Sequence, residues 1–396
     1  MIPRLKPFYD HKELVAALTF WRRGVEDFEE AFAKKFGARY ALAFPYGRSG
    51  LYAFYKAMGI EGAEIIMPAY TCVVVPNATV ISGNIPRFVD CTLDDYNMDL
   101  DEVAGAISDN TRVVIATHLF GYPLDTGRLK EIIRTSGKKI YVVQDCAHSF
   151  ACEWKGRPVC SEPDITLYSL NISKQMSAVF GGIITTRDPE IYRKMKEYRD
   201  TFFTNPSVLK QLKKILYLIA VYVAFNGHIY GFINRLERSG FLNRFVRYYD
   251  ESIIDVPPDF MTKFGDLEGR VGLVQLEKYD EIRRRRIEIA EQYDDQLNGI
   301  PDLVLPPIID GATYSHYVIR TPTRERRDQL MQNLLDHGIQ LGYLIEYSIP
   351  EMPAYTQFRT KECPNSLYCS ERMINLPNYP GLTEIQIHQI CKEYSR

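Results

Sequence analysis

The sequence predicts an α/β protein with a mainly parallel sheet that is flanked by helices on both faces. Along residues 25–190, short apolar runs of strand length alternate with amphipathic stretches of helical spacing. The runs are apolar almost throughout, instead of alternating with polar residues. Continuous apolar runs of this kind are typical of parallel strands that are covered on both sides.

The expected elements follow one another in a regular order. A helix is predicted over residues 25–36, a strand over 40–44, and a second helix over 49–59 that stops at Gly59. Further helices, such as residues 125–137, separate several later strands, which are expected over 64–68, 85–90, 112–118, 139–145, 165–170 and 181–186. Ligands of such sheets bind beyond the carboxyl ends of the strands, so residues at those ends are candidates for a site.

Composition limits the classes of protein to consider. The chain has 396 residues, of which 46% are hydrophobic and 25% charged, as in an ordinary globular protein with room for two domains. The net charge of −2 gives no reason to expect nucleic acid. The eight cysteines form no CxxC pair and follow no zinc-ligand spacing, so reduced thiols in a cytoplasmic protein without a metal site are expected. The N-terminal residues lack the apolar stretch of a signal peptide.

Two residues at predicted strand ends carry the chemistry. Asp145 and Lys174 each follow a short apolar run. A lysine can form a Schiff base with the aldehyde of pyridoxal phosphate, and an aspartate can keep the pyridine nitrogen protonated so that the ring accepts electrons. Taken singly, such an aspartate is more often a turn or cap residue and such a lysine is more often solvated. The pair is the hypothesis, with His118 and the 169–174 segment also at strand ends.

Several sequence blocks support this hypothesis in the expected order. They read "PAYTCVVVPNATVISGNIPRFVDCTLDDYNMD", "THLFGYPLD", "VVQDCAHSFACEWKGRPV" and "SLNISKQMSAVFGGIITT", followed later by "GRVGLVQLEKYDEIRRRR" and "INLPNYPGLTEIQI". These blocks resemble those of the DegT/DnrJ/EryC1/StrS family of aminotransferases. The resemblance implies an aspartate-aminotransferase-type fold, and a homodimer with sites at its interface. It also implies a large cofactor domain, here residues 1–200, and a small C-terminal α/β domain, here residues 256–396, on either side of a helical insertion at residues 201–255.

The resemblance also implies roles for individual residues. Lys174 matches the Schiff-base lysine and Asp145 the partner of the pyridine nitrogen. His148 matches a position near the ring's phenolic oxygen, although a hydrogen-bonded structural histidine is the alternative. Ser169 matches a serine that binds the cofactor phosphate, although a strand-end serine is often only a turn former.

Other positions depart from the family pattern. The phosphate cradle is expected at the start of a helix, where Gly47 allows close backbone approach and Ser49 can donate a hydrogen bond. Arg48 replaces the usual threonine, and its guanidinium could pair with the phosphate or point to solvent. Cys72 stands where members carry an aromatic residue that stacks on the pyridine ring. Met261 stands where members carry an asparagine that reaches the partner subunit.

The insertion is the least family-like segment. Residues 215–234 hold no charged side chain, and basic residues dominate on both sides. The run is broken at residues 226–228, and a single span would place two halves of one enzyme on opposite sides of a membrane. Two interpretations remain, in which residues 207–247 either pack on the protein or its dimer partner, or lie as helices on a membrane surface.

Together these features predict an aminotransferase that uses pyridoxal 5'-phosphate. The family resemblance implies that it would move an amino group from an amino acid, with glutamate as the expected donor, to a nucleotide-linked keto-sugar. The setting would be the synthesis of cell-surface polysaccharide, lipopolysaccharide or a secondary metabolite. Lys174 argues against the family branch that carries histidine there and removes a hydroxyl group. The alternatives are a lipid-linked or membrane-presented substrate, or a non-catalytic regulator that binds the cofactor.

Overall fold

The computed structural model describes residues 1–19, 23–161, 163–225, 230–231 and 250–394. Its centre is a sheet of seven strands in the order β1-β9-β8-β5-β4-β2-β3. Only β9 runs antiparallel to its neighbours, and the other pairings are parallel. The strands are β1 (Tyr40–Phe44), β2 (Glu64–Pro68), β3 (Ile85–Val89), β4 (Thr111–Thr117), β5 (Tyr141–Asp145), β8 (Ile165–Ser169) and β9 (Gly182–Thr186). The predicted fold class is therefore confirmed.

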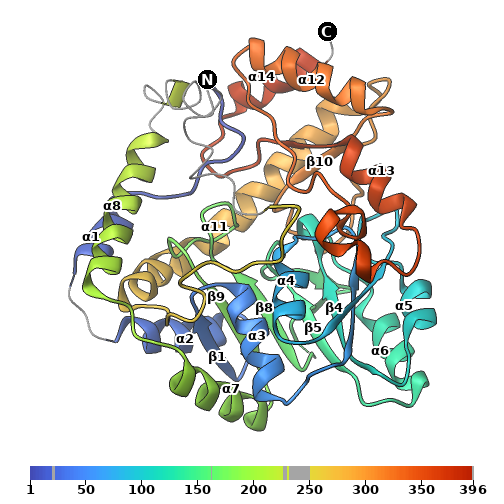
Figure 1. Cartoon of the computed structure of the whole chain (residues 1–396). Helices are drawn as coiled ribbons and strands as arrows, with labels where there is room; N and C mark the ends of the chain where they lie inside the picture. The colour runs from blue at the N-terminus through green and yellow to red at the C-terminus, as the bar shows by residue number, and fades with distance from the viewer. Residues whose placement is uncertain (20–22, 162, 226–229, 232–249, 395–396) are drawn as a thin grey trace.

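Helices cover both faces of this sheet (Figure 1). Successive strand residues alternate between the two sides: Ile65 packs in one apolar cluster with helix α3, and Ile66 packs in another with helices α5 and α6. This explains why the strands read as unbroken apolar runs in the sequence. The helices before and around the sheet are α1 (His11–Leu18), α2 (Gly24–Lys35), α3 (Gly47–Ala57), α4 (Val74–Ile81), α5 (Leu100–Ala106), the 3-10 turn η1 (Leu119–Gly121), α6 (Thr126–Ser136) and α7 (Pro189–Phe202).

Local sequence signals fix where these helices begin and end. The carboxylates of Asp99, Asp125 and Asp188 each accept a hydrogen bond from a first-turn N–H group, which satisfies donors that a helix leaves open. Helix α6 ends at Gly137, whose φ of 66° lies in the left-handed region that glycine adopts without strain. The chain therefore turns sharply after α6 and enters β5 with Asp145 at its far end.

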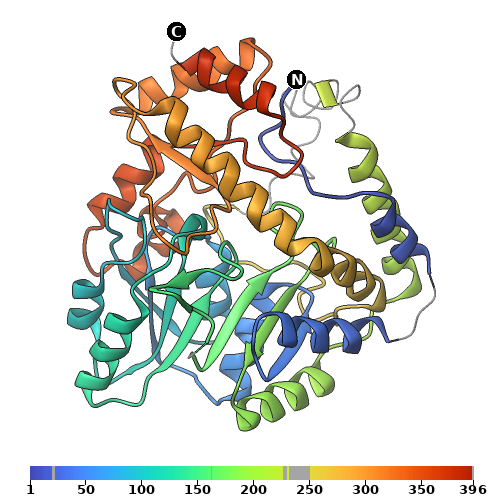
Figure 2. The ribbon, with the colours of Figure 1, turned by 180° about the vertical axis from the view of Figure 1, so that it is seen from behind.

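A 32-residue helix, α11 (Asp266–Leu297), links the sheet to the C-terminal part of the chain. Figure 2 shows it crossing the back of the molecule from α2 to α14. The C-terminal part has a two-stranded antiparallel sheet of β10 and β11. Its elements are β10 (Tyr317–Arg320), α12 (Arg324–Asp336), the 3-10 turns η2 (Ile349–Glu351) and η3 (Pro353–Phe358), α13 (Pro364–Arg372), β11 (Met373–Leu376) and α14 (Glu384–Tyr394); a small hairpin, β6 (Glu153–Trp154) with β7 (Arg157–Pro158), lies earlier in the chain. The division at residues 200 and 255 stays a prediction.

The N-terminal segment is tied to the C-terminal part. The N–H group of Ile2 donates to the carbonyl of Gly338 at 2.8 Å, and the carbonyl of Ile2 accepts from the N–H group of Gln340 at 2.9 Å. Ile2 and Ile339 form a parallel bridge, and both are buried. Residues at the beginning of the sequence thus complete the packing of residues near its end.

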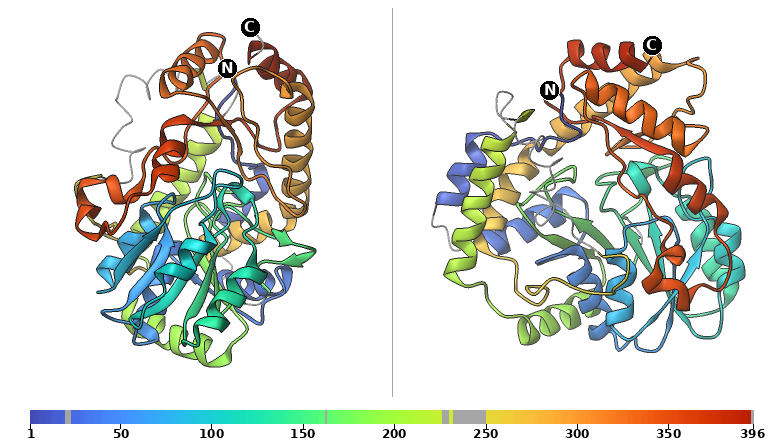
Figure 3. Two further views of the ribbon diagram at one scale, coloured as in Figure 1. Left: turned by 90° about the vertical axis from the view of Figure 1, so that its right-hand side faces the viewer. Right: turned by 45° about the horizontal axis from the view of Figure 1, so that its top comes forward.

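The described part of the insertion is the helix α8 (Val208–Ala224). It runs along one edge of the molecule beside α1 (Figure 3). In the described parts of the chain, no helix combines the length and the hydropathy that crossing a bilayer requires. Most of the remaining predicted membrane-contact segment, residues 226–229 and 232–249, lies outside the described residues.

Candidate active site

The site lies where β5 and β8 end. Asp145 is the last residue of β5, and Ser169 is the last residue of the adjacent, parallel β8. The chain then loops through Lys174 before it returns in β9. The structure therefore brings Asp145, His148, Ser169 and Lys174 to one edge of the sheet, as expected for residues that follow parallel strands.

Lys174 faces His148. The Lys174 Nζ and the His148 Nε2 are 2.8 Å apart. The His148 Nδ1 accepts a hydrogen bond of 3.4 Å from the N–H group of Phe120, which leaves Nε2 as the protonated nitrogen of a neutral ring. Nε2 then donates to Lys174, and only an uncharged amine can accept that proton.

Burial favours the same protonation states. It lowers the pKa of Lys174, although the nearby charges of Cys72 and Asp145 act in the opposite direction. Burial holds the pKa of His148 well below its ordinary value, and a positive charge on Lys174 or on His316 would lower it further. A neutral lysine amine is the form that attacks a carbonyl carbon and that accepts a proton.

Asp145 is buried with one oxygen engaged. Its Oδ1 accepts from the N–H group of Ala147 at 3.0 Å, and the residue is 4% exposed. Burial raises the pKa of the carboxyl group, while the Ala147 hydrogen bond and the charge of Lys174 lower it. Oδ2 accepts no hydrogen bond from the residues that the structure describes. A buried carboxylate with one open oxygen is suited to a cationic N–H partner.

The phosphate end of the predicted site is built from a close approach of two backbones. Gly182 of β9 pairs with Ser169 on one side and with Phe44 on the other. A Cβ atom at Gly182 would overlap the backbone N and Cα of Gly47, the first residue of α3. The N-terminus of α3 therefore lies against the end of β8, next to Ser169. The first N–H groups of a helix carry a partial positive charge that favours an anion.

Two of the predicted cradle residues have other partners. The hydroxyl of Ser49 donates to the carbonyl of Phe260 at 2.8 Å and is fully buried. A serine hydroxyl has a single proton, so Ser49 does not donate to a phosphate in this arrangement, and its expected role is corrected. The guanidinium of Arg48 lies over the ring of Tyr46, 5.1 Å from the ring centre.

Cys72 lies in the loop between β2 and α4 and is partly exposed. A negative charge on this thiol would raise the pKa of Lys174, so the two groups lie in the same part of the molecule. A thiol cannot stack on a pyridine ring as an aromatic side chain does. The structure thus places Cys72 near the expected position, without supplying the aromatic face that family members have.

Two aromatic residues that sequence reasoning missed join the site. The ring of Phe120 stacks on His148, with centres 6.2 Å apart and planes 11° apart, and its φ of 58° is uncommon for a residue with a side chain. The ring of His316, from the start of β10, lies 5.1 Å from that of His148. Backbone strain of this kind is often found at functional sites. A histidine directly before an apolar run, as in "YSHYVIR", was the available signal for His316.

His118, which follows β4, has a structural role. Its Nε2 bonds to the Oε1 of Gln144 at 2.7 Å, and its Nδ1 accepts from the N–H group of Leu124 at 3.0 Å. Both ring nitrogens are therefore occupied by the protein. Burial lowers the pKa of His118 from 6.5 to about 4, although the bond to Gln144 opposes this shift.

The His118 shift predicts that acid destabilises the protein before its carboxylates titrate. Between pH 6.5 and 4, His118 is protonated in the unfolded chain and neutral in the folded chain. The free energy of unfolding therefore falls as the pH falls. We expect this one histidine to account for about 2 kcal/mol between about pH 7.5 and about pH 5. Urea unfolding at both values should show a smaller pH effect in His118→Gln than in wild type. The exposed His388→Gln serves as a control, and equal pH effects in all three proteins would contradict the assignment.

The approach of Gly182 to Gly47 predicts a second effect. Gly182→Ala forces the start of α3 away from β8, so we expect a loss of about 1–3 kcal/mol in unfolding free energy. The affinity for pyridoxal phosphate should also fall at least about tenfold, because the N–H groups move from their anion position. Thermal unfolding and a cofactor titration measure the two effects. Gly105 lies in a helix, and no atom lies within 4 Å of the carbon that alanine would add. Gly105→Ala should therefore lower neither the unfolding free energy nor the affinity for pyridoxal phosphate.

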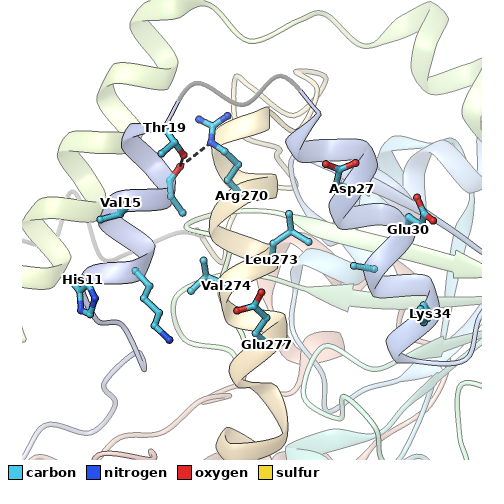
Figure 4. Close-up of a pocket in the computed structure, with 13 residues that line it drawn as sticks. His11, Val15, Thr19, Asp27, Glu30, Lys34, Arg270, Leu273, Val274 and Glu277 are labelled. Carbon is cyan, nitrogen blue, oxygen red and sulfur yellow. Dashed lines mark hydrogen bonds between the residues drawn. The ribbon is translucent and has the colours of Figure 1, made fainter.

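A separate groove is lined by side chains of other elements (Figure 4). It has a volume of about 810 Å³ and runs between α1, α2 and α11. Arg270 crosses its upper end, where its Nε donates to the carbonyl of Ala16 at 2.8 Å. None of the residues that line it belongs to the cluster around Lys174.

Comparison with known proteins gives the class first and then the family. The whole chain superposes on solved aminotransferases, so its fold is that of this class of enzyme. Residues 15–395 match the DegT/DnrJ/EryC1/StrS aminotransferase family, and the chain belongs to that family. Enzymes of this family depend on pyridoxal phosphate.

Three relatives illustrate the match. The GDP-perosamine synthase of Escherichia coli O157:H7 is 25% identical over 369 residues, which span 93% of this chain and 88% of that protein. The putative sugar aminotransferase Spr1654 of Streptococcus pneumoniae, in its PLP form, superposes with a TM-score of 0.78 at 20% identity over 100% of this chain and 97% of that one. A mutant of GDP-4-keto-6-deoxymannose-3-dehydratase with bound GDP-perosamine superposes with a TM-score of 0.79 at 19% identity over 100% of both chains. Structural likeness at these identities establishes the fold.

The residues present fit pyridoxal phosphate. The open oxygen of Asp145 can accept from a protonated ring nitrogen, and Lys174 can hold the aldehyde end. Ser169 and the first N–H groups of α3 offer donors for a phosphate at the other end. Asp145 and Ser169 end neighbouring strands, Lys174 lies in the loop after β8, and the first residue of α3 packs against Gly182, which pairs with Ser169.

Proposed function

We propose that this chain transfers an amino group from an amino acid, with glutamate as the expected donor, to a nucleotide-linked keto-sugar. The observation that carries the proposal is the Lys174 amine held 2.8 Å from His148 beside the buried Asp145. Membership of the aminotransferase family supports the reaction type. The related GDP-perosamine synthase supports a nucleotide-sugar as the acceptor.

Pyridoxal phosphate, when bound, supplies an electrophilic carbon and a ring that accepts an electron pair. The residues of the chain hold the cofactor in place and move the protons. Asp145 holds a proton on the ring nitrogen with its open oxygen, which requires the carboxyl group to stay ionised once a cation lies beside it. Ser169 and the N-terminus of α3 hold the phosphate and so fix the orientation of the ring.

Lys174 is the residue that moves protons. Once free, the Lys174 amine takes a proton from the α-carbon of the amino donor and then gives a proton to a neighbouring atom. On the keto substrate the same two proton transfers run in the reverse order. His148 donates through Nε2 to Lys174, which keeps the amine in place and uncharged. Phe120 stacks on His148 and, by its N–H group, fixes which nitrogen of that ring carries the proton.

The partners and location that we propose extend this function. The protein acts as a homodimer in the cytoplasm, in the synthesis of a cell-surface polysaccharide, lipopolysaccharide or secondary metabolite. A second candidate function, amination of a lipid-linked or membrane-presented substrate, is favoured by the exposed apolar side chains of α8. In that case the enzyme would also contact the cytoplasmic face of a membrane. The non-catalytic alternative is disfavoured, because a regulator has no use for a neutral lysine amine.

The test begins with purified full-length protein loaded with pyridoxal phosphate. Amino acids are screened for loss of the visible absorbance of the bound cofactor, and glutamate is expected to abolish it. Nucleotide-linked keto-sugars are then added, and mass spectrometry detects the amine product. Two outcomes contradict the proposal: no amino acid changes the absorbance, or the donor step proceeds but every keto-sugar is returned unchanged.

A further inference from the structure

Helix α8 is fixed to the body of the protein by one face. Lys214 forms a buried ion pair with Glu268 at the start of α11. Leu218 and Val221 are buried on the same side, and Leu218 joins an apolar cluster with residues of α1 and α11. A buried ion pair demands a defined geometry, so this face sets the rotation of α8 about its axis.

The opposite face of α8 is apolar and exposed. It carries seven large hydrophobic residues whose exposure ranges from 41% to 87%: Val208, Leu209, Leu212, Leu216, Ile219, Tyr222 and Val223. They recur at intervals of three and four residues, so they form one continuous stripe along the helix. Lys213 is the one charged residue of α8 with an exposed side chain. A stripe of this length is far more than the scattered single apolar residues that ordinary surfaces show.

Basic residues outnumber acidic ones in the sequence of this segment. Residues 201–249 contain seven basic residues and a single acidic one, Glu237. Two of the basic residues are already paired, Lys210 with Asp259 at 2.7 Å and Lys214 with Glu268. Lys213 has no partner among the residues that the structure describes. An apolar helix face edged by lysine is the chemistry that binds anionic lipid headgroups over an acyl-chain boundary.

We propose that the exposed face of α8 docks on an anionic lipid bilayer, with the helix lying in the plane of the surface. This rests on the membrane contact proposed above and assigns it to a surface. The 17 residues of α8 make a rod about 25 Å long, which matches an in-plane anchor that is held to the protein along its other side. The stripe enters the acyl boundary, and Lys213 reaches the headgroups from its edge.

A second copy of the chain is the rival occupant. The charged residues of α8 are all lysines, so a two-fold contact between two α8 faces would set lysines of one copy against lysines of the other, with no acidic residue of either helix between them. Such like-charge opposition is unfavourable, whereas an anionic surface is complementary to it. The observations therefore favour the bilayer, and association of two copies becomes an outcome of the test.

Vesicle flotation tests the proposal with the full-length protein loaded with pyridoxal phosphate. The vesicles are phosphatidylcholine, either alone or with about one third phosphatidylserine. Wild type should float with the anionic vesicles and much less with the neutral ones. The double variant Leu212→Gln/Leu216→Gln should lower the ratio of bound to free protein at least about tenfold. Lys213→Gln should lower it about fivefold on anionic vesicles, and high salt should remove that difference.

The control changes two other exposed apolar residues in the same way. Ile308 and Ile385 are 82% and 81% exposed and lie outside α8, so Ile308→Gln/Ile385→Gln should float as wild type does. Lys213→Gln keeps the test decisive if the double leucine variant proves unfolded by circular dichroism.

Three outcomes would overturn the proposal. They are failure of wild type to float, equal flotation of wild type and the Lys213 or leucine variants, and a fall in sedimenting mass of the leucine variant without vesicles. Amine formation measured without vesicles reports on the proposed reaction alone, so the two proposals can fail separately.

Discussion

Lys174→Ala is expected to lower the turnover number by at least about 10³-fold, because it removes both the group that holds the cofactor and the group that moves protons. A readout that does not depend on turnover is available. Borohydride reduction of the loaded wild type should add the mass of the cofactor to the protein covalently, and the variant should gain nothing. Intact-protein mass spectrometry measures both. The position of the Lys174 amine, 2.8 Å from His148, is the observation on which this expectation rests.

Lys34→Ala is a matched control for this experiment. Lys34 lines the groove between α1, α2 and α11, away from the cluster around Lys174, so its removal should leave turnover and the covalent mass gain as in wild type. A Lys174→Ala protein that still forms the covalent product, or that still makes amine at a wild-type rate, would refute the assignment of the lysine.

Asp145→Asn is expected to lower turnover about 10²–10⁴-fold while leaving the covalent attachment at Lys174 possible. Asparagine is nearly the same size, and its carbonyl can still accept from Ala147, so the local fold should survive. It has no charge with which to hold a proton on the ring nitrogen. Turnover measured with the natural cofactor and with N-methylpyridoxal phosphate, whose ring charge is permanent, separates the two roles, because the second cofactor should restore much of the rate.

The control for Asp145 lies at the other end of the same pair of strands. Asp164 precedes β8, and its Oδ2 accepts from the N–H group of Val142 at 2.7 Å. Asp164→Asn should keep that hydrogen bond and the wild-type rate with either cofactor. If the permanently charged cofactor gives no rescue of Asp145→Asn, then Asp145 acts on structure and the electronic role is wrong.

The sheet and the central pair of the site were predictable because both follow from local signals. Strand limits are set by apolar runs, and a residue at the end of a parallel strand has only one edge of the sheet to occupy. Asp145 and Lys174 were expected at one edge of the sheet for that reason, and their roles toward the cofactor stay a prediction. A lysine can form a Schiff base and an aspartate can pair with a pyridine nitrogen, and this combination indicated pyridoxal phosphate as the cofactor.

What the sequence could not supply are partners that are distant along the chain. The hydroxyl of Ser49 donates to the carbonyl of Phe260, which is 211 residues away, and no local sequence pattern predicts that hydrogen bond. His316, directly before β10, lies beside His148 although the two are far apart in the sequence. In the same way, an apolar and basic insertion was evident, but which side of α8 faces outward depends on Glu268.

The pairing of Ile2 with residues 338–340 sets an order on the folding of this chain. Residue 2 leaves the ribosome long before residue 339 exists, so the edge that Ile2 completes is absent during most of synthesis. Ile2 therefore stays without this pairing until residues 338–340 have been synthesised. Folding of this enzyme is therefore complete only when the N-terminal segment pairs with residues 338–340. In a chain arrested before residue 338, Ile2 lacks its hydrogen-bond partners.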